Sequence, residues 1–213
     1  MSITRVAVLI SGSGTNLQAI IDAQLDINIV AVLSDRPAAY GLERATAAGI
    51  HSTAINYKSF SHADDYNAAL ATALDALNPD LIVLAGYMRI LPDNIVNAYA
   101  GRMLNVHPSL LPAYPGLDTY NRALAAGESH HGSTVHFVIP ELDAGPPILQ
   151  YRVQILPAET EPELRERVQQ GEYIIYPRTI EWFAAGRLQL DNNQVMLDGT
   201  ALSEAVIVDA EAC

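Results

Sequence analysis

The chain has 213 residues, half of them apolar and 17% charged, a composition typical of a folded globular protein. Its formal net charge is -12 and Lys58 is the only lysine, which argues against nucleic-acid binding, because that binding depends on neutralising phosphates. No apolar run approaches the roughly 18 residues of a membrane span, and the N-terminus reads as a strand instead of a secretory signal. The single cysteine, Cys213, permits no internal disulfide. We therefore expect a cytoplasmic protein without nucleic-acid or membrane partners.

The first half of the sequence alternates between the patterns of strands and helices. Apolar, β-branched runs predict strands at 4–10, 28–34, 51–55, 80–87 and 102–106. Helical spacing predicts helices at 16–25, 41–48 and 92–100, and one that runs from a Ser61–Asp64 capping box to about Leu77. Gly49 is the expected C-cap of the second helix. This alternating order predicts a parallel sheet with helices on both faces.

The second half begins with a proline-rich segment at 107–117, which should be a loop. A helix is expected at 118–127, antiparallel strands at 133–139 and 148–156, a helix or helix pair at 160–185, and a hairpin around Asn192-Asn193. The predicted fold class is α/β, a doubly wound, mostly parallel Rossmann-like sheet with antiparallel strands added in the C-terminal half. No linker or repeat interrupts the chain, so we expect one domain over 1–213, with a core at about 4–187 and a tail at 188–213.

A glycine-rich loop, SGSGTN at 11–16, follows the first predicted strand and precedes the first helix. Small residues let a ligand approach the backbone, and a helix start presents free N–H groups, so the loop is suited to a phosphate. The loop fits neither common nucleotide fingerprint, because Leu17 stands where a third glycine is needed and the Walker lysine is missing. The alternative is an ordinary turn with Thr15 or Asn16 as the N-cap.

Two polar side chains, Asn105 and His107, lie two residues apart at the end of a predicted strand and therefore point to the same side. Open α/β sheets bind their ligands at this end of their strands. His107 can transfer protons near neutral pH, and Asn105 can donate an N–H to a developing oxyanion. With the downstream carboxylate of Asp143, this set suits attack of an amine on a carbonyl carbon.

Each of these residues also has an ordinary structural interpretation. A single histidine beside a buried strand is often a hydrogen-bonded core residue, and an aspartate near a glycine often belongs to a turn. His136 lies in the middle of a predicted strand, where we expect it to shape the pocket rather than do chemistry. No His, Asp or Glu cluster has the spacing of metal ligands, so no metal is expected.

Five segments, SGSGTNLQAII, LAGYMRIL, LNVHPSLLPAYPG, STVHFV and ELDAGP, occur in the order found in the folate-dependent formyltransferases. The resemblance covers about residues 4–187. It implies transfer of a formyl group from 10-formyltetrahydrofolate to the amine of glycinamide ribonucleotide, without metal or ATP, by a monomer or homodimer. Asn105, His107 and Asp143 are then the catalytic residues. The implied ligand contacts are Gly14, Thr15, Asn16 and Glu172 for the ribonucleotide, and Met88, Arg89, Ile90, Leu91, Asn105, Ile139, Pro140, Glu141, Leu142 and Asp143 for the folate.

The sequence departs from the family pattern at four places. Ala63 stands near a position that is often basic, Ala113 where lysine is common, and Ala144 in place of a glycine; residues 117–120 read LDTY where relatives often carry histidine. These changes put individual folate contacts and loop motion in doubt and leave the three catalytic residues intact.

Three alternatives remain. A formyltransferase that acts on methionyl-tRNA normally adds a C-terminal RNA-binding barrel, for which the tail after Arg187 is short. A formyltetrahydrofolate hydrolase normally carries an N-terminal regulatory domain, whereas the core here starts at residue 4. A non-catalytic nucleotide-sensing module would need the glycine loop but not the catalytic residues.

Overall fold

The computed structural model describes residues 3–210, so Cys213, on which the disulfide expectation rests, lies outside the described residues. Contacts within the chain divide it into two units, Met1–Leu104 and Asn105–Cys213, which are described separately. The expectation of a single domain stays a prediction.

The first unit is built on a parallel sheet with the strand order β4-β1-β2-β3. All pairings between neighbours in this order are parallel. Residues 6–10 of β1 are all buried, as expected for a strand covered on both faces. The predicted parallel sheet is therefore confirmed. The strands are β1 (Thr4–Ile10), β2 (Ile27–Ser34), β3 (Ser52–Ala54) and β4 (Leu81–Leu84).

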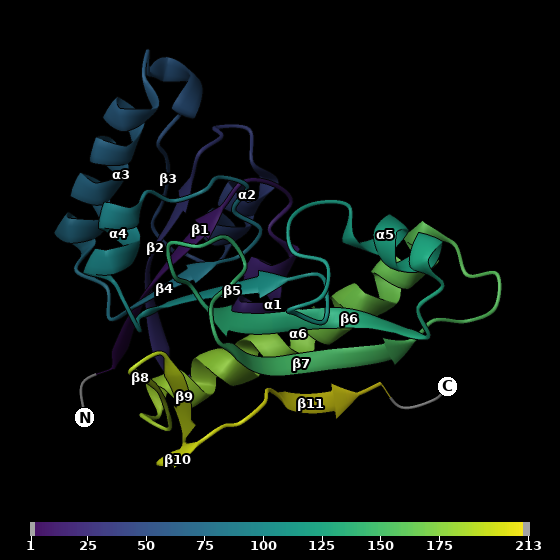
Figure 1. Cartoon of the computed structure of the whole chain (residues 1–213). Coiled ribbons are helices and arrows are strands. Elements are labelled where there is room, and N and C mark those ends of the chain that lie inside the picture. The colour runs from purple at the N-terminus through teal and green to yellow at the C-terminus, as the bar shows by residue number, and fades with distance from the viewer. Residues whose placement is uncertain (1–2, 211–213) are drawn as a thin grey trace. The chain divides into compact units, whose positions relative to one another are not determined.

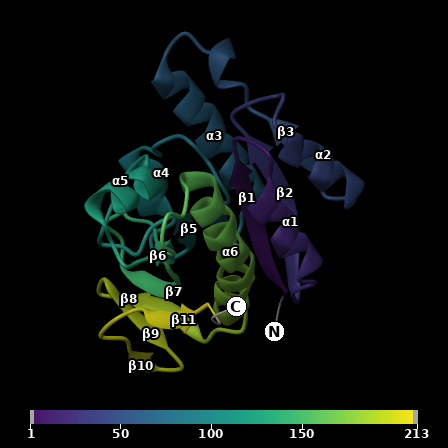
Figure 2. The ribbon, with the colours of Figure 1, turned by 90° about the vertical axis from the view of Figure 1, so that its right-hand side faces the viewer.

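Helices cover both faces of this sheet: α1 and α2 lie on one side of β1 and β2, and α3 lies on the other (Figure 2). α3 buries Tyr66, Leu70 and Leu74, the four-residue spacing of an amphipathic helix. The predicted capping box before α3 is wrong, because His62 is the N-cap residue and makes no side-chain cap bond. The helices of this unit are α1 (Thr15–Asp22), α2 (Tyr40–Ala47), the 3₁₀ turn η1 (Tyr57–Ser59), α3 (Ala63–Leu77) and α4 (Asp93–Ala98).

The strand order reverses beside β1, because β2 lies on one side of it and β4 on the other. Open α/β sheets bind ligands outside the carboxyl ends of the strands at such a reversal. Two segments leave the sheet there, the glycine loop after β1 and residues 85–92 after β4. β4 is shorter than predicted, because Gly86 has a φ of 74°, which an extended strand does not allow.

The second unit contains most of β5 (Met103–His107), with β6 (His130–Phe137) and β7 (Pro147–Gln154), which pair antiparallel as predicted. β11 (Val206–Asp209) lies beside β7 and runs parallel to it (Figure 1). α6 (Glu161–Ala184) packs against β6 and β7, and α5 (Thr119–Ala126) packs against α6. The sequence predicted either one helix or a helix pair at 160–185, and the structure has one continuous helix, α6. This helix starts with a capping box formed by Thr160 and Glu163.

A small antiparallel sheet follows α6, formed by β8 (Leu188–Asp191), β9 (Gln194–Leu197) and β10 (Thr200–Ala201). The predicted hairpin is confirmed: Asn192 and Asn193 both have positive φ, at 47° and 63°. β10 and β11 were not predicted, since two to four residues are too few to show a period. None of the helices in residues 3–210 has both the length and the apolar character to cross a membrane.

Candidate active site

The glycine loop is held in shape by α2. Gly14 is the N-cap of α1 with a φ of 71°, and a Cβ added there would lie 2.6 Å from the Cα of Gly41. Arg44 donates from Nε to the carbonyl of Ser13 at 2.9 Å, and the N–H of Gly41 donates to the carbonyl of Gly12 at 3.1 Å. These bonds hold two carbonyl oxygens of the loop in place just before α1, whose first turn carries the partial positive charge that attracts an anion. Glycine at position 14 is therefore required by both backbone angle and space.

Residues 88–91, which follow β4, alternate between exposed and buried side chains. Met88 and Ile90 are 63% and 71% exposed, whereas Leu91 is 6% exposed. The N–H of Met88 donates to Oγ of Ser11 at 2.9 Å, which joins this segment to the glycine loop within the first unit. Two exposed apolar side chains beside a fixed backbone form a surface suited to a flat, largely apolar ligand.

His107 is buried at the end of β5 and has partners at both ring nitrogens. Nε2 lies 3.0 Å from the carbonyl oxygen of Tyr114, and Nδ1 lies 3.4 Å from Oδ2 of Asp143. The same Oδ2 accepts the N–H of Gly116 at 2.8 Å. The Tyr114 carbonyl can only accept, so Nε2 carries a proton, and Nδ1 is the ring nitrogen that faces the Asp143 carboxylate. The structure thus brings His107 and Asp143 together, as the sequence predicted.

Asn105 faces the next strand, where Nδ2 lies 3.1 Å from Nε2 of His136. Nδ1 of His136 lies 2.8 Å from the carbonyl oxygen of Phe137, which can only accept, so Nδ1 carries the proton and Nε2 accepts from Asn105. Burial lowers the pKa of His136 below its ordinary value, more strongly than its bond to Phe137 raises it. A neutral His136 therefore fixes the amide of Asn105 and leaves its second N–H for another acceptor.

The loop of residues 138–146 carries Asp143, whose φ of 51° is left-handed. A Cβ added at Gly145 would lie 1.7 Å from the carbonyl oxygen of Phe137, so the loop passes directly against β6. This approach sets the direction of Asp143 toward His107. Leu142 is 55% exposed on the same loop, where the sequence predicted folate contacts at Ile139, Pro140 and Glu141 as well.

Glu172 lies within α6 and is 6% exposed. Burial is the main cause of the raised pKa of Tyr120, and the charge of Glu172 is the second. The helix passes β7 closely here, because a Cβ at Gly171 would overlap the ring of Tyr151. Glu172 stays a predicted ribonucleotide contact.

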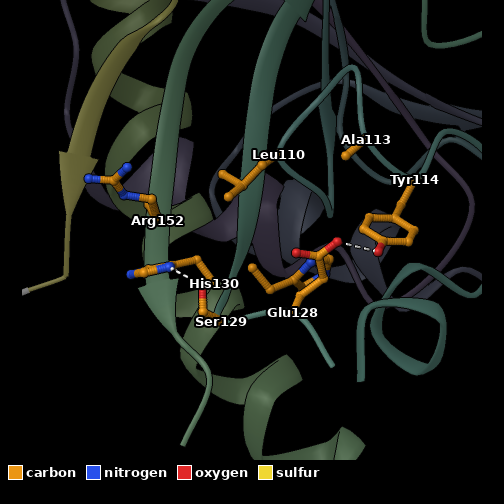
Figure 3. A pocket seen from close by; sticks show the side chains of 8 residues that line it. Leu110, Ala113, Tyr114, Glu128, Ser129, His130 and Arg152 are labelled. Carbon is orange, nitrogen blue, oxygen red and sulfur yellow. Dashed lines mark hydrogen bonds between the residues drawn. The ribbon is translucent and has the colours of Figure 1, made fainter. Parts of the chain in front are cut away.

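A pocket of about 290 Å³ opens beside the loop that follows β5 (Figure 3). Tyr114 contributes its ring to this pocket, and its hydroxyl donates to Glu128 at 2.6 Å. His131 also lines it; burial lowers the pKa of His131 to about 4, and its Nε2 is buried without a hydrogen-bond partner among the described residues. The pocket contains none of the three predicted catalytic residues. Its lining is Leu110, Ala113, Tyr114, Glu128, Ser129, His130, His131 and Arg152.

Sequence reasoning missed the supporting residues. His136 was expected to shape the pocket rather than do chemistry, but the sequence did not indicate that it bonds directly to Asn105. The partner of His107 Nε2 is the backbone of Tyr114, a position that side-chain chemistry cannot indicate. In the first unit, no sequence pattern indicated that Arg44 bonds to the glycine loop or that Asp35 bonds to Arg89. Within residues 3–210, no group of three or more His, Cys, Asp or Glu residues is arranged to hold a metal ion.

Comparison with known proteins places this geometry in a family. The family model described as formyl transferase matches residues 4–180. Phosphoribosylglycinamide formyltransferase of Escherichia coli is 48% identical over 201 residues, which cover 92% of this chain and 95% of that protein. The human trifunctional purine biosynthetic protein adenosine-3 is 42% identical over 197 residues, 89% of this chain and 19% of that protein.

Solved structures agree with the sequence relatives. The phosphoribosylglycinamide formyltransferase of Coxiella burnetii has a TM-score of 0.92 and 51% identity, covering 96% of this chain and 100% of that one. Glycinamide ribonucleotide transformylase 1 of Symbiobacterium toebii has a TM-score of 0.87 and 44% identity, covering 92% and 94%. These matches confirm the predicted Rossmann-like α/β class and the resemblance to the folate-dependent formyltransferases. The chain belongs to the formyl transferase family.

Proposed function

We propose that the protein is a phosphoribosylglycinamide formyltransferase. It transfers the formyl group of 10-formyltetrahydrofolate to the primary amine of N1-(5-phospho-β-D-ribosyl)glycinamide. The products are formylglycinamide ribonucleotide and tetrahydrofolate, and the reaction is a step of de novo purine biosynthesis that yields IMP. The observation that carries the proposal is the arrangement of Asn105, His107 and Asp143, in a chain whose relatives bear this enzyme's name.

The reaction forms a bond between the amine nitrogen and the formyl carbon and breaks the bond from that carbon to N10 of the folate. A tetrahedral intermediate with a negatively charged oxygen lies between the two steps. The N–H of Asn105 that His136 does not use stabilises this oxyanion, at a position fixed before the substrate binds. No ATP or metal takes part in the proposed reaction.

His107 and Asp143 manage the proton that the amine loses and N10 gains. Nε2 of His107 is held by the Tyr114 carbonyl, so Nδ1, which faces Asp143 at 3.4 Å, is the nitrogen that exchanges protons. That distance is longer than a strong hydrogen bond, so a reacting group can share the Nδ1 proton. Asp143 stabilises the imidazolium through its charge.

The ligand-binding residues follow from the same proposal. Gly14, Thr15 and Asn16 bind the ribonucleotide phosphate through the start of α1, and Glu172 contacts the ribonucleotide. Met88, Ile90 and Leu91 pack against the folate, Arg89 belongs to the same segment, and residues 139–143 wrap its pterin ring. The acidic chain, with one lysine, makes backbone N–H groups the main phosphate donors. The proposed setting is cytoplasmic, as a monomer or homodimer.

A direct assay tests the proposal. Purified protein is mixed with 10-formyltetrahydrofolate and the ribonucleotide, with a chelator and without ATP, and tetrahydrofolate formation is followed by absorbance. We expect turnover that depends on both substrates and a product whose mass increases by one carbonyl group. Formate release without the amine would identify a hydrolase, and formylation of methionyl-tRNA in place of the ribonucleotide would identify the other transferase. A folded protein that binds both ligands without turnover would contradict any catalytic function.

A further inference from the structure

Arg89 is enclosed by two residues from other parts of the first unit. Its Nε donates to Oδ2 of Asp35, directly after β2, at 3.0 Å. Its guanidinium carbon lies 3.1 Å from the ring centroid of Tyr57, in η1. Tyr57 is also joined to Asp35, because its N–H donates to the Asp35 carbonyl at 3.1 Å. The three residues form a closed triangle in which each side is a direct contact, so Arg89 has little freedom to leave this position.

Asp35 is an unusual residue for a purely structural role. Its side chain is 1% exposed, and burying a carboxylate is costly unless it is paired. Among the described residues, Oδ1 has no hydrogen-bond partner, while Oδ2 accepts from Arg89 at 3.0 Å and lies 3.7 Å from Nε of Arg36. Buried carboxylates that stabilise a fold normally have both oxygens satisfied. Arg89 is the closer and less exposed of the two cations and the one that is hydrogen-bonded, so it is the main partner of Asp35.

The neighbours of Arg89 are anchored as well. The hydroxyl of Tyr87 is hydrogen-bonded to that of Tyr66 on α3, and the N–H of Met88 is bonded to Ser11. Burial raises the pKa of both tyrosines, so this hydroxyl pair stays protonated at neutral pH. Residues 87, 88 and 89 are thus held from separate parts of the first unit: by α3, by the glycine loop, and by Asp35 together with η1. The exposed side chains on either side of Arg89, Met88 and Ile90, take their direction from this backbone.

We propose that Asp35 and Tyr57 are positioning residues for the co-substrate: by holding Arg89 they fix the segment 88–91 in the shape that binds the folate. This inference rests on the proposed function. Neither residue contacts the reacting atoms, so their loss should weaken folate binding and leave the chemical step and the ribonucleotide loop nearly unchanged. A preorganised binding segment gains affinity because its ordering cost is met during folding.

The test uses Asp35→Asn, which keeps the shape and removes the charge, and Tyr57→Leu, which removes the ring. For each we expect the KM for 10-formyltetrahydrofolate to rise about tenfold, the effect of losing one charge-assisted contact. The KM for the ribonucleotide and kcat should change less than about twofold. Tyr57→Phe keeps the ring over the guanidinium and should restore most of the folate affinity lost in Tyr57→Leu.

A second readout is independent of catalysis. Amide hydrogen exchange of a peptide that covers residues 86–92 should be faster in Asp35→Asn than in the wild type, since the segment then opens more readily. Asp198→Asn is the matched control, because it removes a carboxylate paired with Arg187 at 2.7 Å in the second unit. It should change neither the folate KM nor exchange at 86–92.

The outcomes separate the proposals. Faster exchange with an unchanged folate KM would show that Asp35 is only structural and overturn the positioning role. Unchanged exchange would overturn the premise that Asp35 holds the segment. A rise in both KM values, or a loss of kcat alone, would contradict a role limited to the folate. A wild-type protein without turnover would overturn the proposed function and the co-substrate role together, while exchange would still decide whether Asp35 holds the segment.

Discussion

The two units present their candidate functional groups in different ways. In residues 3–104 the groups are backbone N–H donors and exposed apolar side chains, fixed by side chains such as Arg44 and Asp35 that lie behind them. In residues 105–210 they are polar side chains, each held by a near neighbour: the Tyr114 carbonyl holds His107, the Gly116 N–H holds Asp143, and the His136 ring holds Asn105. The first arrangement suits binding, because its charge state does not change near neutral pH. The second suits proton transfer and stabilisation of an oxyanion, because its side chains are held in place before a substrate binds.

The largest expected effect is the loss of the chemical step in the second unit. Asn105→Ala removes an oxyanion donor and His107→Ala removes the proton carrier, so each should lower kcat by about 10²–10⁴-fold. Steady-state kinetics would measure this, with KM values changed less than about threefold. His130→Ala, at an exposed histidine on β6, is the control and should leave kcat unchanged. A variant that raises only KM would break the comparison, since that residue would then contribute to binding and not to the chemical step.

The glycine loop of the first unit gives the next effect, on binding and stability. Gly14→Ala places a Cβ 2.6 Å from the backbone of Gly41 at a φ of 71°, so it should cost about 1–3 kcal/mol of unfolding free energy and raise the ribonucleotide KM at least tenfold. Gly12→Ala is the matched variant for stability, because a Cβ there meets nothing within 4 Å. Denaturant unfolding and kinetics measure both quantities. Equal stability of the two variants would contradict the backbone argument.

The last effect concerns acid stability in the second unit and is absent at neutral pH. His131 has a pKa of about 4 in the folded chain, against about 6.5 when unfolded, so the unfolded state binds the extra proton first as the pH falls. Above about pH 6.5, His131 therefore does not lower the free energy of unfolding. Between about pH 6.5 and 4, it lowers that free energy by up to about 3 kcal/mol. His131→Gln cannot titrate and should lack this component in unfolding measured from pH 7 to 4. Parallel pH curves for wild type and variant would show that His131 is not responsible.

The sequence indicated the chemical residues because their types and spacing are local properties. Asn105 and His107 lie two apart on one strand, and the segment around Asp143 is recognisable in a family motif. Their supports could not be read in the same way. His136 reaches Asn105 only because β6 lies beside β5, and Asp35 meets Arg89 across 54 residues of sequence. Such pairings depend on strand order, which spacing along one chain does not contain.

By itself, the sequence determined the order of strands and helices in the first unit, the hairpin at Asn192-Asn193, the acidic charge and the three candidate catalytic residues, because periodicity, turn chemistry and composition act over short distances. The tertiary structure decided which nitrogen of His107 faces Asp143, that His136 holds Asn105, that residues 160–185 contain one continuous helix, and that a buried carboxylate anchors Arg89. These features require groups far apart in the chain to meet in a dry interior, where each hydrogen bond must find its partner.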